Sequence, residues 1–585
     1  MRNSFSSVIL VISMFVTSCS ETVNKNNNMN SNEEFNSYKD SFVEELWQLY
    51  PEWASEVGYT KYDSVLKVPD ENYRAAQLQF ANSHLEKLKF FTDESLDKAN
   101  KADKAMMQNY LESIIFNIKE FKSYEWNPSN YNVAAAIADI LNDKKRDVQQ
   151  KLRMVYLRLK SVSDYYAAAK NNIKNPTLEH TELAIKQNKG TLTYLQGTVL
   201  DSISKAHFKA HEEQSMIAAL ESAVNAVNDY ITFLEETLKS MLQQGNLRNF
   251  RIGENLYNKK FQYEIESGYS AKEIYEKALK RKEALHAEMS RIADELWPKY
   301  MANTRPPRDD KHKVKLLIDR IAENHVHRDS FFNAVETQIK ELVEFVNQKQ
   351  LIYLDPSKPL IVRKTPEYMD GVAGASISSP GPYDKEGNTY YNVTPLTSYS
   401  DAEAESYLRE YNHYILQILN IHEAIPGHYT QLVYANQSPS IIKSILGNGA
   451  MIEGWAVYTE RMMLEEGYNN SPEMWLMYYK WHLRVVCNTI LDYGVHVLNM
   501  EESDAMELLM NEAFQEEAEA KGKWKRVTLT SVQLCSYFTG YTEIYDLREE
   551  IKKKQGEKFN LKQFHETFLS FGSAPIREIK KLMEY

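Results

Sequence analysis

Residues 419–431, LNIHEAIPGHYTQ, bring two histidines and a glutamate close together in the sequence. In the familiar H-E-x-x-H pattern of zinc enzymes, two histidines one helical turn apart present their imidazoles on one helix face. His422 and His428 are instead six residues apart, which would turn the second ring by about 240° on a regular helix. Pro426 and Gly427 lie between them and favour a local break that could bring the rings together again. The spacing alone therefore leaves a metal site open without deciding it.

A second acidic stretch follows in residues 447–461, GNGAMIEGWAVYTER. Glu453 and Glu460 lie seven residues apart, which places them on nearly the same face of a helix. A carboxylate from this helix would complete a three-ligand site and leave one position for water, as in catalytic zinc sites. The alternative is a pair of solvated surface acids. The apolar neighbours, Trp455 among them, indicate a buried helix, where an unpaired carboxylate is costly.

HEAIPGH followed by EGWAVYTE resembles the bacterial family grouped as domain of unknown function 885. Its members are regarded as metallopeptidases with an H-E-x-x-P-G-H motif and a later E-G-W-A-x-Y segment, and many are lipoproteins. The resemblance covers most of the chain from about residue 40, and its specific motifs lie between about 370 and 550. It implies a distant relation to helical zinc peptidases such as angiotensin-converting enzyme. Carried over, it implies one zinc ion per chain, bound by His422, His428 and Glu453, with Glu423 as the general base.

Further site residues are expected downstream. His496, in a D-x-G-x-H segment similar to one of the family, would donate to a substrate carbonyl or oxyanion, or else be a structural histidine. In QLCSYFTGY, Tyr537 is the first candidate for a phenolic oxyanion donor and Tyr541 the second. Because the chain has 38 tyrosines, packing is the alternative for either.

Two features suggest substrate contacts. The guanidinium of Arg484 can clamp a substrate carboxylate, or it can pair with Asp492 in a structural ion pair. Ala375 lies in a segment from Gly371 to Tyr383 that is expected to form an edge strand, along which zinc peptidases commonly align a substrate backbone. A plain surface hairpin is the alternative for this segment.

The elements that position these residues are expected to be mainly α-helical. Only 20 Gly and 17 Pro occur in 585 residues, and apolar residues recur at spacings of three and four. Helix breaks are expected at 175–176, 245–246, 268 and 306–307. A small β element at about 355–398 beside the active-site helices has expected strands at 360–362, 375–378 and 390–393. The predicted division is a helical N-terminal region over 36–345 and a catalytic region over 346–585.

The first residues read as a targeting segment. Residues 1–18, MRNSFSSVILVISMFVTS, have a basic start and an apolar stretch too short to span a bilayer. They end at Cys19 in a pattern similar to the lipobox of bacterial lipoproteins, so Cys19 is the expected lipidation site; an ordinary secretory signal is the alternative. Residues 19–35 are Asn-rich and are expected to be a flexible tether.

These observations predict an exported bacterial lipoprotein of the cell envelope that contacts the membrane through its lipid anchor only. The net charge of −12 argues against a nucleic acid partner. The expected function is a zinc-dependent peptidase acting on short peptides, either a carboxypeptidase or an oligopeptidase. The alternatives are a non-catalytic peptide-binding lipoprotein with a remnant metal site, or an amidase acting on cell-wall peptides. The sequence leaves the peptide preference and the oligomeric state open.

Overall fold

The computed structural model describes residues 31–143, 145–245, 247–365, 375–384 and 387–583. Over these residues the chain is mainly α-helical with one small three-stranded sheet, as predicted. The predicted signal peptide, Cys19 and the glycine-containing segment Gly371–Gly374 lie outside the described residues. Within the described part of the chain, no helix combines the length and the apolar character needed to cross a bilayer.

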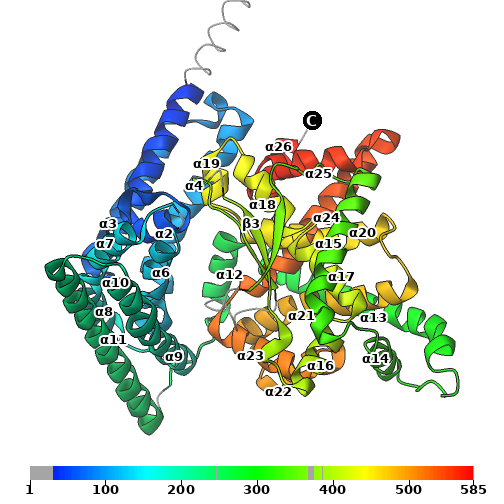
Figure 1. Ribbon diagram of the computed structural model, residues 1–585. Coiled ribbons are helices and arrows are strands. Elements are labelled where there is room, and N and C mark those ends of the chain that lie inside the picture. Colours follow the sequence, from blue (N-terminus) through cyan, green and yellow to red (C-terminus); the bar gives the residue numbers. More distant parts are fainter. Residues whose placement is uncertain (1–30, 144, 246, 366–374, 385–386, 584–585) are drawn as a thin grey trace, which may run out of the picture.

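The N-terminal helices form the upper left of the molecule in Figure 1. Residue Phe35 is fully buried in the first of them, and its ring centroid lies 4.9 Å from that of Phe91. The predicted tether over 19–35 therefore extends too far, because residues 31–35 are already helical and contribute an aromatic ring to the core. The helices of this group are residues 31–49, α2 (Pro51–Glu56), α3 (Glu71–Leu88) and α4 (Lys98–Phe116).

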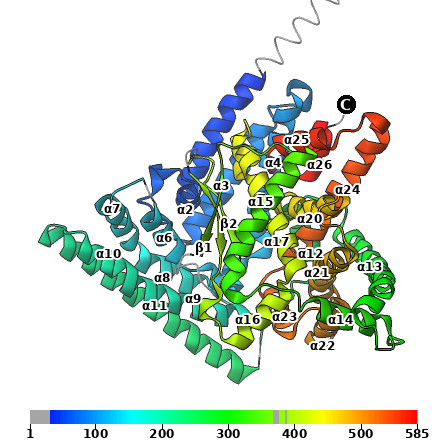
Figure 2. The same cartoon turned by 45° about the vertical axis from the view of Figure 1, so that its right-hand side comes forward.

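The next helices enclose a hydrophobic core of their own, built from apolar side chains between Leu66 and Leu234. Their expected apolar stripe is largely buried, with Leu152, Val155 and Leu159 each about 1% exposed. The long α11 forms the outer edge of this group in both views (Figures 1 and 2). The helices are α5 (Ser123–Trp126), α6 (Ala134–Asn142), α7 (Val148–Leu159), α8 (Val162–Asn172), α9 (Leu178–Tyr194), α10 (Leu200–Lys205) and α11 (Ala210–Gln244).

Most of the remaining helices form the right-hand part of Figure 1, and they share one large core with the N-terminal helices. This core draws side chains from both sides of the predicted boundary at residues 345–346. The helices are α12 (Gly253–Glu264), α13 (Ala271–Tyr300), α14 (Asp310–Ile321), α15 (Phe331–Lys349), α16 (Asp401–Glu410), α17 (His413–Glu423), α18 (His428–Gln437), α19 (Ile441–Ile445), α20 (Gly449–Glu465), α21 (Pro472–Leu498), α22 (Glu502–Glu507), α23 (Glu517–Leu529), α24 (Ser536–Gln555), α25 (Leu561–Ser570) and α26 (Ile576–Met583).

A buried ion cluster ties the N-terminal helices to the C-terminal ones. Asp103 of α4, 1% exposed, pairs with Lys39 at 2.6 Å and with Lys443 of α19. Ser440 donates a hydrogen bond to the same carboxylate at 2.8 Å. Because each buried charge has a partner, the cluster avoids the cost of an isolated buried ion.

The sheet has the order β1-β3-β2 and lies between the N-terminal helices and the helices α15 and α17 (Figures 1 and 2). β1 (Leu360–Lys364) is parallel to the central β3 (Thr389–Val393), and β2 (Ala375–Ser378) is antiparallel to it, with Ala375 opposite Val393. The three strands occupy the predicted positions, and residues 385–386 of the connection between β2 and β3 lie outside the described residues. β2 is an edge strand and contacts α17, the helix that carries His422.

Candidate metal centre

The HEAIPGH segment breaks the helix where the sequence predicts a break. α17 ends at Glu423, the Ile425–Pro426 peptide bond is cis, and α18 begins at His428. No residue with a side chain fits at position 427 without moving the backbone, because a Cβ atom on Gly427 would lie 1.9 Å from the backbone oxygen of His422. Trp455 of α20 donates from its indole Nε1 to the backbone oxygen of Pro426 at 2.9 Å and so holds the turn. The turn brings the two imidazoles together, with ring centroids 4.8 Å apart.

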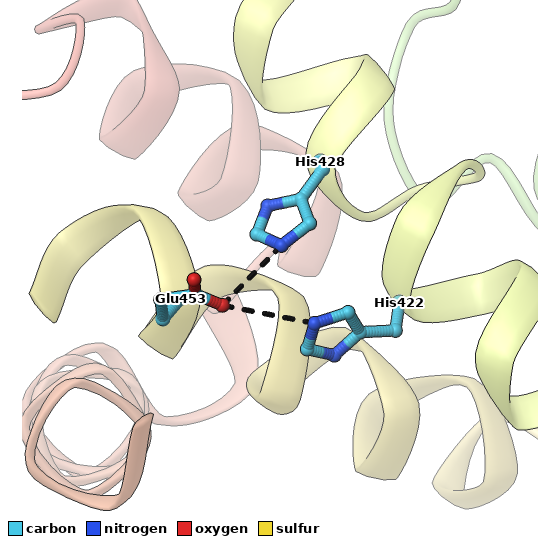
Figure 3. A group of neighbouring side chains, drawn as sticks. All are labelled: His422, His428 and Glu453. Atoms are coloured by element: carbon cyan, nitrogen blue, oxygen red, sulfur yellow. Dashed lines mark ion pairs between the residues drawn. The ribbon is translucent and has the colours of Figure 1, made fainter. Parts of the chain in front are cut away.

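His422, His428 and Glu453 converge from three helices, and each offers one ligand atom to a common point (Figure 3). The Nε2 atom of His422 lies 3.7 Å from Glu453 Oε2, and that of His428 lies 3.4 Å from the same oxygen. All three ligand atoms lie within 4.8 Å of one another. Tetrahedral ligands bonded to zinc at about 2.0–2.1 Å are separated from each other by roughly 3.3 Å. The donor set and its spacing therefore fit a zinc ion.

Glu460 orients His422 from the opposite side. Its Oε1 atom accepts hydrogen bonds from His422 Nδ1 at 2.7 Å and from Trp481 Nε1 at 3.1 Å. Since the indole can only donate, this oxygen is an acceptor, which places a proton on Nδ1 and turns Nε2 toward Glu453. Glu460 is fully buried. A carboxylate in this position would support a zinc-ligating histidine, and its complete burial rules out the alternative of a solvated surface acid.

The electrostatics of the centre suit a cation. Burial opposes the charging of His422, but the interactions with Glu453 and Glu460 outweigh burial and raise the pKa of His422 well above its usual value. Burial would also raise the pKa of Glu453, yet the two imidazoles lower it below the usual range. Burial raises the pKa of Glu460. Three carboxylates, including Glu423, thus surround two imidazoles, an excess of negative charge that a divalent cation would neutralise.

A close contact between α20 and α24 fixes the position of Glu453. Gly454 and Gly540 meet there, and a Cβ atom on Gly540 would lie 1.8 Å from the backbone oxygen of Ala450. Asn448 starts α20 by accepting a hydrogen bond from Met451 N at 2.8 Å. The two glycines let the helix backbones touch, so the carboxylate of Glu453 is carried on a helix that has little freedom to shift.

Glu423 is the last residue of α17 and directly follows His422. Its side chain is half-buried and forms no hydrogen bond or ion pair with any residue that the structure describes. Its charge still acts on His422 and on the buried Tyr391, whose hydroxyl donates to Asn420 at 2.8 Å. This half-buried carboxylate without a partner thus lies beside the candidate metal ligands.

A second group of potential ligands, Glu283, His286 and Glu512, differs in its surroundings. Glu512 pairs with Lys282 and, at 3.2 Å, with Lys311. His286 Nε2 lies 2.7 Å from the backbone oxygen of Glu512 and donates to it. Two ammonium groups already neutralise this carboxylate, so the group lacks the negative excess of the His422 centre.

His496 does not reach the metal centre, which corrects its expected role as an oxyanion donor. It lies on the same helix as Trp481 but about 22 Å further along the axis, at about 1.5 Å per residue. Its buried Nε2 contacts the backbone oxygens of Val527 at 2.9 Å and Thr530 at 2.8 Å. Asp492 likewise accepts from backbone amides of the segment before α24. The D-x-G-x-H segment therefore anchors the chain between α23 and α24.

The other predicted residues lie outside the group of three ligand atoms and have partners of their own. Tyr537 lies one turn before Gly540 on α24, and its hydroxyl accepts from Arg526 Nη2 at 3.3 Å. Tyr541 accepts from Arg461 Nη1 of α20 at 2.8 Å. Arg484 pairs with Glu519 at 2.6 Å, in place of the ion pair with Asp492 that the sequence suggested. Ala375 begins the edge strand β2.

Sequence reasoning missed three residues around the centre: Trp455, Trp481 and Lys523. Trp455 is part of the EGWAVYTE motif, so its link to the Pro426 turn had a sequence signal. Trp481 and Lys523 lie far from the motifs in the sequence, and nothing in their neighbours marks them. Their placement depends on the packing of α21 and α23.

Comparison with known proteins agrees with this fold. The profile of the family described as "Bacterial protein of unknown function (DUF885)" matches residues 51–583. The chain belongs to this family. No curated protein matches it.

Two solved structures are similar over nearly the whole chain. A predicted lipoprotein of unknown function from Shewanella oneidensis is 52% identical, covers 94% of this chain and 99% of its own, and superposes with a TM-score of 0.88. A predicted lipoprotein from Colwellia psychrerythraea is 18% identical over 94% of this chain and 98% of its own, with a TM-score of 0.75, and shares the fold.

Proposed function

We propose that this member of the family is a zinc-dependent peptidase that hydrolyses short peptides. The observation that carries the proposal is the meeting of His422, His428 and Glu453 within 4.8 Å, with His422 oriented by Glu460. Such a three-donor set leaves a position for water and substrate, which separates a catalytic zinc site from a closed structural one. The chemistry that a bound zinc ion supplies is polarisation of the scissile carbonyl and a lowered pKa of water, to about 7.

The protein's own groups would handle the proton. Glu423, half-buried and without a partner in the described chain, takes the proton of the attacking water and passes it to the leaving amine. Tyr537 is the remaining candidate donor to the oxyanion, because its hydroxyl accepts from Arg526 of α23, the helix whose Lys523 interacts with the charge of Glu453. The edge of β2 beside α17 offers backbone groups to an extended substrate.

Metal analysis and peptide digestion test the proposal together. Purified protein should bind one zinc ion per chain, and His422→Ala should lose it, whereas His286→Ala in the second ligand group should retain it. Digestion of a peptide library, followed by mass spectrometry, should give cleavage that Glu423→Gln abolishes while it keeps zinc. A Glu423→Gln variant that cleaves at the wild-type rate would reject the base. Zinc binding without any cleavage would instead support a peptide-binding lipoprotein, and cleavage confined to D-amino-acid peptides would support a cell-wall amidase.

We also propose that Cys19 is acylated and anchors the enzyme in the cell envelope. The lipobox-like sequence before Cys19 and the description of the 52% identical relative as a predicted lipoprotein support this. Fatty-acid labelling of the expressed protein should depend on Cys19, so Cys19→Ala should abolish the label and release the protein from the membrane fraction. A labelled Cys19→Ala variant would contradict the anchor.

A further inference from the structure

One face of α23 carries charged side chains at helical spacing: Glu519, Lys523 and Arg526. Lys523 is only 6% exposed, although lysine is almost never buried without an acidic partner. It forms no hydrogen bond or ion pair with any residue in the described part of the chain. Charging this amine without a partner is costly, and an anion bound beside it would offset that cost.

Arg484 of α21 extends this cationic face toward the metal centre. Its Nη2 pairs with Glu519 at 2.6 Å and the guanidinium also interacts with Tyr411 and Glu410, while its buried Nη1 forms no direct hydrogen bond. The guanidinium lies over the ring of Trp481, 5.0 Å from the centroid, and Trp481 donates to Glu460. The unpartnered Nη1 is therefore two side chains away from the histidine ligand that Glu460 orients.

Arg526 adds a third cation on the side of α24. Its Nη2 donates to Gln533 Oε1 at 2.6 Å and to the Tyr537 hydroxyl at 3.3 Å. Burial, and then the positive charges of Arg484 and Arg526, lower the pKa of Lys523 well below its usual value, against the opposing charges of Glu519 and Glu453. The acids that act on these groups already have other interactions: Glu519 pairs with Arg484, Glu410 pairs with Lys480 at 2.7 Å, and Glu453 belongs to the metal centre.

We propose that Lys523, with Arg484 and Arg526, binds the free C-terminal carboxylate of a peptide substrate. The inference rests on the proposed peptidase function and specifies it. Glu453 is close enough to Lys523 for their charges to interact, and successive residues of an extended peptide are about 3.8 Å apart. A carboxylate at Lys523 would then place a peptide bond near the chain end at the metal centre. The enzyme is accordingly a carboxypeptidase that removes one or two residues.

Three matched peptides test this in the wild-type protein: a free acid that ends in Gln, its C-terminal amide, and an amide that ends in Glu. The free acid should be cleaved with at least tenfold higher kcat/KM than either amide, and the first product should be one or two C-terminal residues. Equal rates for the acid and the Gln amide, or internal cuts, would overturn the subsite and leave the peptidase proposal intact. A Glu-ending amide as good as the acid would assign the cations to a side chain and overturn it as well.

A binding assay separates the subsite from catalysis. Calorimetry with zinc-loaded Glu423→Gln should give tighter binding of the free acid than of the amide, whether or not the wild type cleaves either peptide. Equal affinities would overturn the inference, whereas absent cleavage by the wild type would count against the peptidase proposal alone.

Variants on α23 then assign the effect to one residue. Lys523→Met should lower kcat/KM for the free acid roughly 10- to 100-fold, the usual worth of a charged hydrogen bond, and leave the amide unchanged. Lys525→Met, an exposed change on the same helix, is the matched control. Lys523→Arg keeps the charge and should restore part of the preference. Unchanged acid-to-amide ratios in folded Lys523→Met would contradict the assignment; if that variant does not fold, the wild-type binding comparison decides.

Discussion

The hydrogen bond between Glu460 and His422 offers a quantitative test of how the metal centre is built. In Glu460→Gln the amide oxygen can still accept from His422 Nδ1 and Trp481 Nε1, which lie at 2.7 and 3.1 Å in the native protein. The variant therefore removes the negative charge and keeps the shape. Groups that support a ligating histidine in this way typically contribute 10- to 100-fold in metal affinity. At about 1.4 kcal/mol per factor of ten, the expected loss is roughly 1.4–2.7 kcal/mol of zinc binding free energy.

The assay is a titration of metal-free protein with zinc against a fluorescent chelator of known affinity. Glu466→Gln, at the end of the same helix, is the control and should bind zinc as the wild type does. Circular dichroism of both variants should confirm that they are folded, because Glu460 is fully buried. A Glu460→Gln variant with wild-type zinc affinity would refute the role of Glu460 in orienting His422, and so would an equal loss in the control.

Three further predictions concern the scaffold. Gly540→Ala should lower the free energy of unfolding by about 1–3 kcal/mol in denaturant and weaken zinc binding, because the new methyl group would collide with the backbone of α20. Gly522→Ala, with open space around it, is the control and should raise the free energy of unfolding by up to about 1 kcal/mol. Equal effects of the two changes would contradict the contact between α20 and α24. Burial lowers the pKa of His565 to about 4. Between about pH 6.5 and 4 only the unfolded chain therefore binds this proton, so the free energy of unfolding falls by as much as about 3 kcal/mol as the pH is lowered through that range. His565→Gln should reduce this pH dependence of thermal unfolding, whereas the exposed His312→Gln should not. His496→Gln should lower the melting temperature but leave zinc affinity and kcat/KM unchanged, and a loss of kcat alone would restore His496 to the active site.

Local backbone chemistry made part of the site predictable. Pro426 and Gly427 interrupt a helix wherever they occur together, so a break between His422 and His428 followed from the sequence, and the structure has it. The strand Ala375–Ser378 was likewise predictable, because turn-forming residues flank a short β-prone run.

Contacts between distant helices were not predictable in the same way. Lys523 lies in EAEAKGKWKRVTL, which reads as a solvent-exposed helix, and only the packing of α23 buries it. His496 was expected at the site by resemblance, but the length of α21 carries it far from Trp481. Phe35 appeared to end a polar tether, whereas its ring belongs to the core. For these three residues, the packing of helices that are distant in the sequence determines burial and position, and the local sequence pattern does not.

The central claim is that one zinc ion is bound by His422, His428 and Glu453. Anomalous diffraction at the zinc absorption edge, from crystals grown with zinc, tests it most directly. The account predicts a single strong peak about 2.0–2.2 Å from both Nε2 atoms and from a Glu453 carboxylate oxygen. A peak at Glu283, His286 and Glu512 instead, or no peak between the two imidazoles, would contradict it.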